Sequence, residues 1–280
     1  MSRPGQMTPT TSISRSTRGA DYQNVPRPVS ALADEYPHGH IDPPHTHRRA
    51  QLLYATTGVM TVTTDSASFV APPQRAVWVP AGVVHSARCR GHVSCRTLYI
   101  DTEAVPDLAG GCRVIEVSDL LRELIVEATR LPIEYDQGGR DGRIMALIID
   151  EITASRSVPL QVPMPNDRRL ARICVQVLDD PAAGDALDGL AAAAAMGRRT
   201  FTRAFRRETG MSFAAWRQHV RLIEALSLLS VGGAVTNVAF EVGYASPSAF
   251  TAAFRRAFGA APTRYLAAGA PTGAGLRSTA

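Results

Sequence analysis

Short apolar runs separated by turn residues fill the stretch from Glu35 to Thr102. The runs are rich in β-branched and aromatic residues, with glycine, proline and aspartate between them. This pattern is typical of short strands, and several such strands in succession are typical of a sandwich or barrel. We therefore predict a small all-β barrel as one domain, assigned to residues 35–110.

From Val117 to Arg156 the apolar positions follow a helical period instead. Ser118 is a candidate cap for a first helix, and the Gly138-Gly139 break precedes a second. Such an apolar pair packs on its own barrel or on another subunit, and we assign residues 111–157 to it. The positions that share a helix face are Leu121, Leu124, Ile125 and Ala128, then Ile144, Leu147, Ile148 and Glu151.

The ends of the chain and the join between its halves lack such periods. Residues 1–34 are rich in Ser, Thr, Pro and Arg, which predicts a disordered arm, and residues 269–280 are assigned as a flexible tail. Prolines interrupt the segment before Leu170, so residues 158–167 are predicted to be a linker. An all-α domain over residues 168–268 follows. Its first helix is predicted to bury Leu170, Ile173, Cys174 and Val177.

The strongest pattern is a duplication inside this helical domain. Phe201–Gly210 and Phe250–Gly259 share seven of ten residues at an offset of 49 positions, 250 minus 201. Such a repeat indicates a duplicated supersecondary unit, and two helices joined by a tight turn, the second basic, form a helix-turn-helix. We predict two units, with Arg198–Thr209 and Pro247–Phe258 as recognition helices.

The two predicted units differ at the turn and at the helix start. In the second unit Gly243 supplies a positive backbone angle and Ser246 caps the helix. In the first, Ala195 and Gly197 occupy these places, which predicts a turn about 1 kcal/mol less favourable and a cap weaker by a few tenths of a kcal/mol, roughly. A helix capped by Ser212 joins the units. At roughly 25 Å it can hold both recognition helices in successive major grooves.

The two units together resemble a known family. The phrases RRTFTRAFRRETGMS and VGYASPSAFTAAFRRAFGAAPTRY are similar to the DNA-binding domain of the AraC/XylS family of bacterial transcription regulators. The similar stretch runs from Leu190 to Leu266, about a third of the chain. The resemblance implies a regulator that binds a double-stranded DNA operator, with RNA polymerase as a candidate partner.

Side chains outside the core stripe of each recognition helix are the candidate DNA contacts. We expect Arg199 and Arg203 to contact base edges and the flanking arginines to contact phosphates. The second helix offers Ser, Thr and Ala, which form few hydrogen bonds with bases, so we expect it to be less selective. For any single arginine the alternative is a solvated charge. The full set is Arg198, Arg199, Thr202, Arg203, Arg206, Ser248, Thr251, Arg255 and Arg256.

Histidines gather in the predicted barrel. His45 and His47 point to one face of a strand because side chains repeat every second residue. HTHRRAQLLYATTG resembles the first motif of the cupin superfamily, and PAGVVH, which ends at His85, resembles the second. The resemblance implies an RmlC-like jelly roll in which the three histidines meet, with Gln51 as candidate fourth ligand. It also implies a divalent transition metal (Zn, Ni, Fe or Mn), although Gln51 stands where metal-binding cupins usually have Glu.

An organic-ligand pocket is the alternative to a metal site. There the histidines and Gln51 form hydrogen bonds with one another, and Tyr54, Arg75 and Trp78 are candidate lining residues together with Met60. Ordinary core positions remain the other interpretation of the two aromatic residues. His38 and His40 are expected at the rim.

A zinc site at Cys89, His92 and Cys95 is disfavoured because odd spacings alternate strand faces. The barrel motifs are most similar to the NimR-like subgroup of the family, which implies a small-molecule or metal-linked effector and transporter or efflux genes as targets. The helical segment resembles the family's dimerisation helices, which implies a homodimer. A metal-dependent cupin enzyme fused to a DNA-binding domain is the rival, disfavoured by Gln51, and a constitutive nucleoid-type binder is a second.

Composition adds little. The formal net charge of +5 and pI near 9.3 suit a polyanionic partner, and all 30 strong cations are arginine. Four cysteines without a CxxC pair, and no long apolar run, favour a cytoplasmic protein with reduced thiols and no membrane partner. The resemblance to transcription regulators, with Gln51 in place of Glu, implies that it is not an enzyme.

Overall fold

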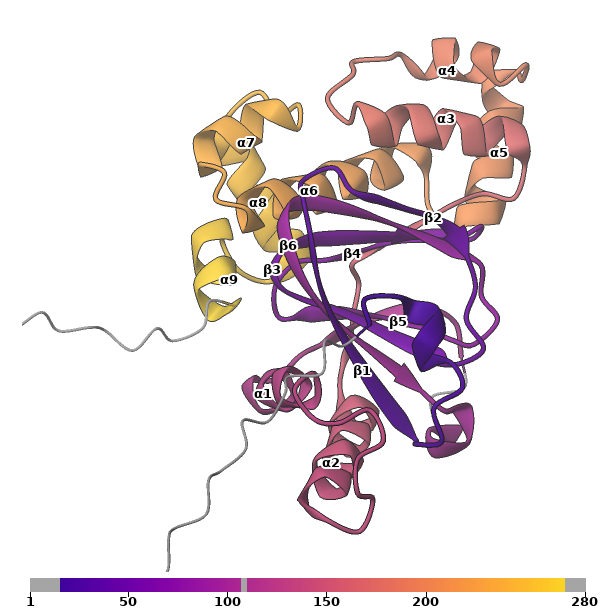
Figure 1. The fold of residues 1–280 in the computed structure, drawn as a ribbon. Coiled ribbons are helices and arrows are strands. Elements are labelled where there is room, and N and C mark those ends of the chain that lie inside the picture. The colour runs from indigo at the N-terminus through magenta and orange to yellow at the C-terminus, as the bar shows by residue number, and fades with distance from the viewer. Residues whose placement is uncertain (1–15, 107–109, 270–280) are drawn as a thin grey trace, which may run out of the picture.

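The computed structural model describes residues 16–106 and 110–269, in which an antiparallel β domain is followed by a helical domain (Figure 1). This confirms the predicted order of an all-β domain, a helical pair and an all-α domain. The strands are β1 Val29–Tyr36, β2 Ile41–His45, β3 Ala50–Thr63, β4 Ala67–Ala71, β5 Arg75–Val79, β6 His85–Ile100, β7 Arg113–Glu116, β8 Ser157–Val158 and β9 Gln161–Pro163.

The long strands β3 and β6 form the centre of the sheet. They pair from Ala50 opposite Ile100 to Thr63 opposite Ser86, with irregular register between Ala55 and Val59. One half of this pair continues to β1 and to β5, β7 and β8, while the other continues to β2 and to β4 and β9. Both halves of each long strand therefore contribute to one interior.

Two helices cover the outer face of this sheet, below it in Figure 1. They are α1 Asp119–Ala128 and α2 Arg140–Ala154, and the Ser118 hydroxyl accepts a hydrogen bond from the amide of Leu121 as its cap role predicts. The predicted inward residues of α1 are confirmed at Leu121, Ile125 and Ala128. The stripe predicted for α2 is only partly right, because Met145, Ile148 and Ile152 are buried and Leu147 is 39% exposed.

The predicted boundary of a disordered arm is wrong from residue 16 onward. A 3-10 helix, η1 Gly19–Tyr22, buries Tyr22 completely, and β1 begins at Val29. Residues 1–15 lie outside the described residues, as do residues 270–280 of the predicted tail. The predicted linker also differs, because β9 pairs with β4 and so belongs to the sheet. Pro163 is the last residue of β9, and Pro159 and Pro165 lie outside the strand, so the three prolines do not interrupt its pairing.

The helical domain contains α3 Arg168–Asp179, α4 Leu187–Ala193, α5 Arg198–Thr209, α6 Phe213–Ser230, α7 Val235–Glu241, α8 Pro247–Phe258 and α9 Pro262–Gly269. Both recognition helices, α5 and α8, have the predicted bounds. The predicted core of α3 is confirmed, since Leu170, Ile173, Cys174 and Val177 are all buried. Within the described residues no helix combines the length and apolar character needed to cross a membrane.

Candidate functional site: a DNA-binding surface and a histidine cavity

Each recognition helix is held by phenylalanines on its inner face. In α5, Phe205 packs edge-to-face against Phe213 and Trp216 of α6, at centroid distances of 5.2 and 5.6 Å. In α8, Phe254 packs in the same way against Phe258 and Tyr265, at 4.5 and 5.7 Å. This packing leaves the opposite face of each helix to solvent.

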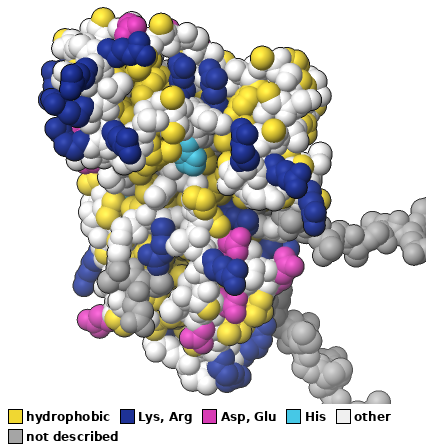
Figure 2. Space-filling model, turned by 180° about the vertical axis from the view of Figure 1, so that it is seen from behind, with side chains coloured by type: hydrophobic (Ala, Val, Ile, Leu, Met, Phe, Trp, Pro, Cys, Tyr) yellow, Lys and Arg dark blue, Asp and Glu magenta, His cyan; other side chains and the backbone are white. Residues whose placement is uncertain are grey.

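The predicted DNA contacts lie on that solvent face. In α5 the side chains of Arg198, Arg199, Arg203 and Arg206 are exposed, and in α8 so are those of Ser248, Arg255 and Arg256. Thr202 and Thr251 are half-buried, and the Thr202 hydroxyl donates to the Arg198 carbonyl at 3.0 Å. Figure 2 shows arginine side chains gathered on the lobe that contains α3–α5. An arginine-rich face beside a helix N-terminus is suited to phosphates and base edges.

The turn and cap differences predicted between the units are present. Ala195 has φ +52° and Gly243 has φ +83°, both in the left-handed region. The Ser246 hydroxyl accepts a hydrogen bond from the Ala249 amide at 3.2 Å, whereas Gly197 offers no side-chain cap. The first unit therefore contains one strained turn residue and one uncapped helix start.

Inside the barrel, the three predicted histidines come together. Ring nitrogens of His45, His47 and His85 lie within 4.8 Å of one another, and the Nε2 atoms of His45 and His47 are 3.1 Å apart. His45 is opposite His85 in the pairing of β2 with β6, and the loop before β3 supplies His47. The Nε2 atom of His85 is 2.9 Å from the Gln51 side-chain oxygen, so the predicted amide is part of the cluster.

The surroundings of the cluster lower the pKa values of His47 and His85 and so favour their neutral forms. Burial, together with smaller contributions from the nearby His45 and His85, lowers the pKa of His47 to about 4. Burial also lowers the pKa of His85, against a hydrogen bond to the Val83 carbonyl that raises it. Neutral imidazole is the form that ligates a metal.

The cluster lies at a cavity of about 420 Å³ between the two halves of the sheet. Its apolar lining includes Leu32, Leu53, Met60, Ala87 and the thiols Cys89 and Cys95, and its polar lining adds Asp42, Thr97 and Tyr99. The Asp42 carboxylate is 3.6 Å from His45 Nε2. The sequence prediction missed Asp42 and Tyr99, although Asp42 precedes His45 by three residues and Tyr99 is opposite Gln51 in the sheet.

Comparison with known proteins agrees with this geometry. A model described as a helix-turn-helix domain matches residues 190–268, and one described as an AraC-like ligand binding domain matches residues 27–152. The transcriptional regulator NimR of Escherichia coli is 33% identical over 225 residues, which cover 80% of this chain and 82% of NimR. The chain belongs to the AraC family of transcriptional regulators.

Other proteins similar to this AraC-family chain cover different shares of it. RipA of Corynebacterium glutamicum is 35% identical over 37% of this chain and 31% of its own length. Among solved structures, the DNA-binding domain of AdpA in complex with a target DNA is 36% identical over 35% of this chain and 89% of that one, with a TM-score of 0.34. Fatty-acid-bound ToxT of Vibrio cholerae is 13% identical over 85% of this chain and 94% of that one, with a TM-score of 0.36. The helix-turn-helix model that matches residues 190–268 identifies the DNA-binding part of this regulator.

Three predicted cavity residues lie elsewhere in the regulator. Tyr54 and Trp78 are buried in the core between the sheet and helices α1 and α2, and the Arg113 guanidinium lies 5.8 Å from the Trp78 ring centroid. Arg75 forms an ion pair with Glu116 at 3.3 Å. The prediction was wrong for a reason visible in the sequence: Gln51 and Tyr54 are three residues apart on one strand, so they point to opposite faces.

The predictions for the remaining histidines and for the cysteines have different outcomes. His38 is exposed and accepts a hydrogen bond from the Gly91 amide, in line with an outer position. His40 lines the cavity, stacked on Tyr36 at a centroid distance of 4.4 Å. Cys89 and Cys95 face the cavity whereas His92 is exposed beside Glu35, so these three residues form no common site.

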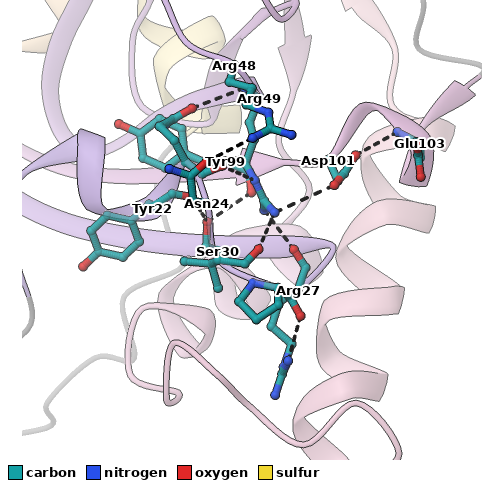
Figure 3. Close-up of polar contacts among 12 residues, drawn as sticks. Tyr22, Asn24, Arg27, Ser30, Arg48, Arg49, Tyr99, Asp101 and Glu103 are labelled. Carbon is teal, nitrogen blue, oxygen red and sulfur yellow. Dashed lines mark hydrogen bonds and ion pairs between the residues drawn. The ribbon is translucent and has the colours of Figure 1, made fainter.

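A buried arginine that the sequence prediction missed fixes the N-terminal segment beside the cavity (Figure 3). The Arg49 guanidinium donates to the carbonyls of Gln23, Val25 and Arg27, at 3.2, 2.6 and 2.9 Å. Asp101 lies 3.8 Å away and offsets part of its charge. A cation shared among three carbonyls explains why residues that look like a polar tail in the sequence are ordered.

Proposed function

We propose that this AraC-family protein is a sensor-regulator in which His45, His47 and His85 hold a divalent transition metal, with occupancy of the cavity controlling operator binding. The observation that carries the proposal is the convergence of three imidazoles whose ring nitrogens lie within 4.8 Å of one another. Imidazole nitrogen suits Zn, Ni, Fe and Mn, and small side-chain rotations bring three donors at this spacing to one ion. When bound, the metal supplies an electrophilic centre that a ligand donor atom can coordinate.

The chain's own residues define the rest of this proposed site. The Gln51 side-chain oxygen lies 2.9 Å from His85 Nε2 as a hydrogen-bond acceptor. Because Gln51 is uncharged, it leaves a bound dication less neutralised than a Glu would. Asp42 lies beside His45 and holds one negative charge near the cluster. A metal site with neutral ligands suits sensing better than hydrolysis, and Asp42, the one carboxylate among the described cavity residues, lies against the proposed ligand His45 at 3.6 Å. We therefore propose a regulator without catalytic activity.

The second candidate is an organic effector without metal. Two observations favour it: the cavity of about 420 Å³ is far larger than an ion, and the histidines already have hydrogen-bond partners in His45–His47 and His85–Gln51 contacts. The lining beyond the histidines is largely apolar, with Leu32, Leu53 and Met60. An effector with one polar end and an apolar body matches that lining.

For DNA, we propose that Arg199 and Arg203 of α5 contact base edges, with Arg198 and Arg206 on phosphates. Their exposure and their place on the first turns of α5 support this assignment. In α8, Ser248 and Thr251 are the proposed base contacts, with lower selectivity. Arg255 and Arg256 lie in its last turn and are assigned to phosphates.

We further propose a homodimer through the outer surface of α1 and α2. Leu120 and Leu147 are 50% and 39% exposed there while the inner faces pack on the sheet. Because the proposed partner is a DNA operator, we propose that the regulator acts in the cytoplasm and contacts RNA polymerase there. Transporter or efflux genes are the proposed targets, on the resemblance to the NimR-like subgroup alone.

Metal content tests the proposal directly. Untagged protein purified without chelator is compared with a His45→Ala/His85→Ala variant, and His38→Ala serves as the matched histidine control because His38 is exposed and outside the cluster. The proposal expects about one metal per chain in the wild type and in the control, and none in the double variant. Absence of metal from all three, together with failure to take up added Zn²⁺, would support the organic effector.

A further inference from the structure

Strand β6 has two faces that lead to different parts of the molecule. Ala87 and Cys89 line the histidine cavity, and His85 carries one of its imidazoles. Arg88 and Arg90 line a separate cavity of about 340 Å³ between the sheet and helices α3 and α6. Because successive side chains of a strand point to opposite faces, a displacement of this stretch reaches both cavities at once.

Arg90 connects β6 to the DNA-binding domain. Its Nη2 atom is 2.6 Å from the Glu224 carboxylate of α6, and the two side chains are only 33% and 26% exposed. Among the ion pairs of the described residues, no other joins the β domain to the helical domain. A short, partly shielded pair is the kind that retains its strength in salt.

The neighbouring residue of the strand is shaped for the same approach. Gly91 has φ +71°, and a Cβ built there would lie 3.0 Å from Val231, just past the end of α6. At the other end of α6, Trp216 and His219 bond the carbonyls of Pro163 and Gln161 in β9, at 2.7 and 2.8 Å. Helix α6 is thus held to the sheet near both of its ends. Among the described residues, Arg90 forms the one ion pair between α6 and a strand that lines the histidine cavity.

The place of Glu224 in α6 determines which parts of the helical domain the ion pair with Arg90 can influence. Helix α6 joins the two helix-turn-helix units and contacts α5, α7, α8 and α9. Glu224 lies in its second half, five residues after His219. Any change in how α6 is held therefore moves both recognition helices together rather than one alone.

We infer that the Arg90–Glu224 ion pair is the contact through which occupancy of the histidine cavity sets the position of α6. Arg90 and Glu224 are positioning residues for DNA binding, since neither lies on a recognition helix. The inference rests on the proposed function, because it takes the cavity to be the effector site. It adds the route by which that site reaches the DNA-binding domain: His85, along five residues of β6, to α6.

The first test needs no effector. Hydrogen–deuterium exchange of the metal-free, full-length chain is compared between wild type and Glu224→Gln, which keeps the shape of the side chain and removes its charge. The matched control is Glu35→Gln, because Glu35 pairs at 3.1 Å with Arg96, another arginine of β6, and both of these residues belong to the β domain. Exchange in β9 and in the barrel-facing part of α6 is expected to rise several-fold in Glu224→Gln alone. Equal exchange in all three proteins would overturn the inference.

The second test measures the coupling. Affinity for a duplex selected in vitro by the full-length protein is measured with and without Zn²⁺, alongside the affinity for Zn²⁺ itself. Wild type and Glu35→Gln are expected to show a Zn²⁺ effect of about fivefold or more on DNA affinity. Glu224→Gln is expected to bind Zn²⁺ as well as wild type with the DNA effect reduced to within about twofold of none, and the swapped pair Arg90→Glu/Glu224→Arg to regain it.

The outcomes separate the two proposals. An unchanged Zn²⁺ effect in Glu224→Gln overturns the inference and leaves metal sensing standing. Lack of any Zn²⁺ effect in the wild type overturns metal sensing, and the exchange comparison then decides the ion pair by itself. Loss of Zn²⁺ binding in Glu224→Gln would also contradict a positioning role, because Glu224 lies outside the cavity.

Discussion

The two helix-turn-helix units have the same fold but different surfaces. At the offset of 49 residues, Phe201 and Phe205 of α5 correspond to Phe250 and Phe254 of α8, and all four are fully buried. On the solvent face, Arg199 and Arg203 correspond to Ser248 and Ala252. The two copies have thus kept the residues that build the unit and differ at the residues that we propose to contact DNA.

The units also differ in the residues that stabilise their turns and helix starts. The second has Gly243 in its turn and Ser246 as cap, whereas the first has Ala195 at φ +52° and the uncapped Gly197. The first unit therefore combines the arginines that we propose to contact bases with the more strained turn. We expect α5 to dominate affinity and selectivity and α8 to act mainly as a well-formed second anchor.

Truncating the core phenylalanine of either unit is the largest expected effect. Phe205→Ala and Phe254→Ala each remove a fully buried ring and should each lower the free energy of unfolding by about 3–5 kcal/mol. Urea denaturation of the two variants measures this. A much smaller loss for one of them would show that the two cores are not equivalent.

Arg203→Ala should break the asymmetry in recognition, since it gives α5 the residue that α8 has at Ala252. We expect DNA affinity to fall by about 1–3 kcal/mol, with relaxed selectivity at one base pair. Binding to the selected duplex and its single-base variants provides the measurement. Thr251→Ala in α8 is the control, and a larger loss there than in Arg203→Ala would reverse our assignment of the units.

Exchanging the turn residues should sharpen the comparison of the two frames. Gly243→Ala is expected to cost about 1 kcal/mol or more of stability, because of its φ of +83° and because the new Cβ would lie 3.0 Å from Arg221 Nη2. Ala195→Gly should gain about 0.4–1 kcal/mol. Thermal unfolding of both variants measures these shifts. Destabilisation by Ala195→Gly would mean that its turn is not strained.

The caps give the smallest expected difference. Ser246→Ala should cost about 1 kcal/mol by removing the hydrogen bond to the Ala249 amide, whereas Gly197→Ser should gain a few tenths, roughly. Urea midpoints of the two variants are the measurement, with Ser248→Ala, an exposed residue of the same helix, as control. Equal effects of Ser246→Ala and Ser248→Ala would mean that the Ser246 cap does not stabilise α8.

Several features were predictable because they depend on local sequence. The bounds of α5 and α8, the caps at Ser118, Ser212 and Ser246, and the buried face of α3 follow from helical periodicity and side-chain-to-backbone hydrogen bonds a few residues apart. The meeting of His45, His47 and His85 was predictable only through the cupin-like motifs. Spacing alone gives the shared face of His45 and His47 but not the approach of a strand forty residues later.

Two of the wrong predictions, the disordered arm and the linker, have one physical origin. Order in residues 16–34 depends on Arg49 donating to three carbonyls, and the strand character of the predicted linker depends on β4 as its neighbour. Both are contacts between segments distant in sequence, so no local pattern records them. Tyr54 and Trp78 are a different case, since strand alternation already excluded Tyr54 from the face of Gln51.

By itself, the sequence determined the two duplicated DNA-binding units and the residue types of the histidine cluster, since helix periodicity, caps and strand alternation act over a few residues. Only the tertiary structure decided which side chains share the cavity with the histidines, why the N-terminal segment is ordered, and that Arg90 meets Glu224. Those outcomes depend on how a long bent strand pairs and on what packs against its outer face. Such contacts are selected by burial and charge across the whole fold rather than by neighbours in the chain.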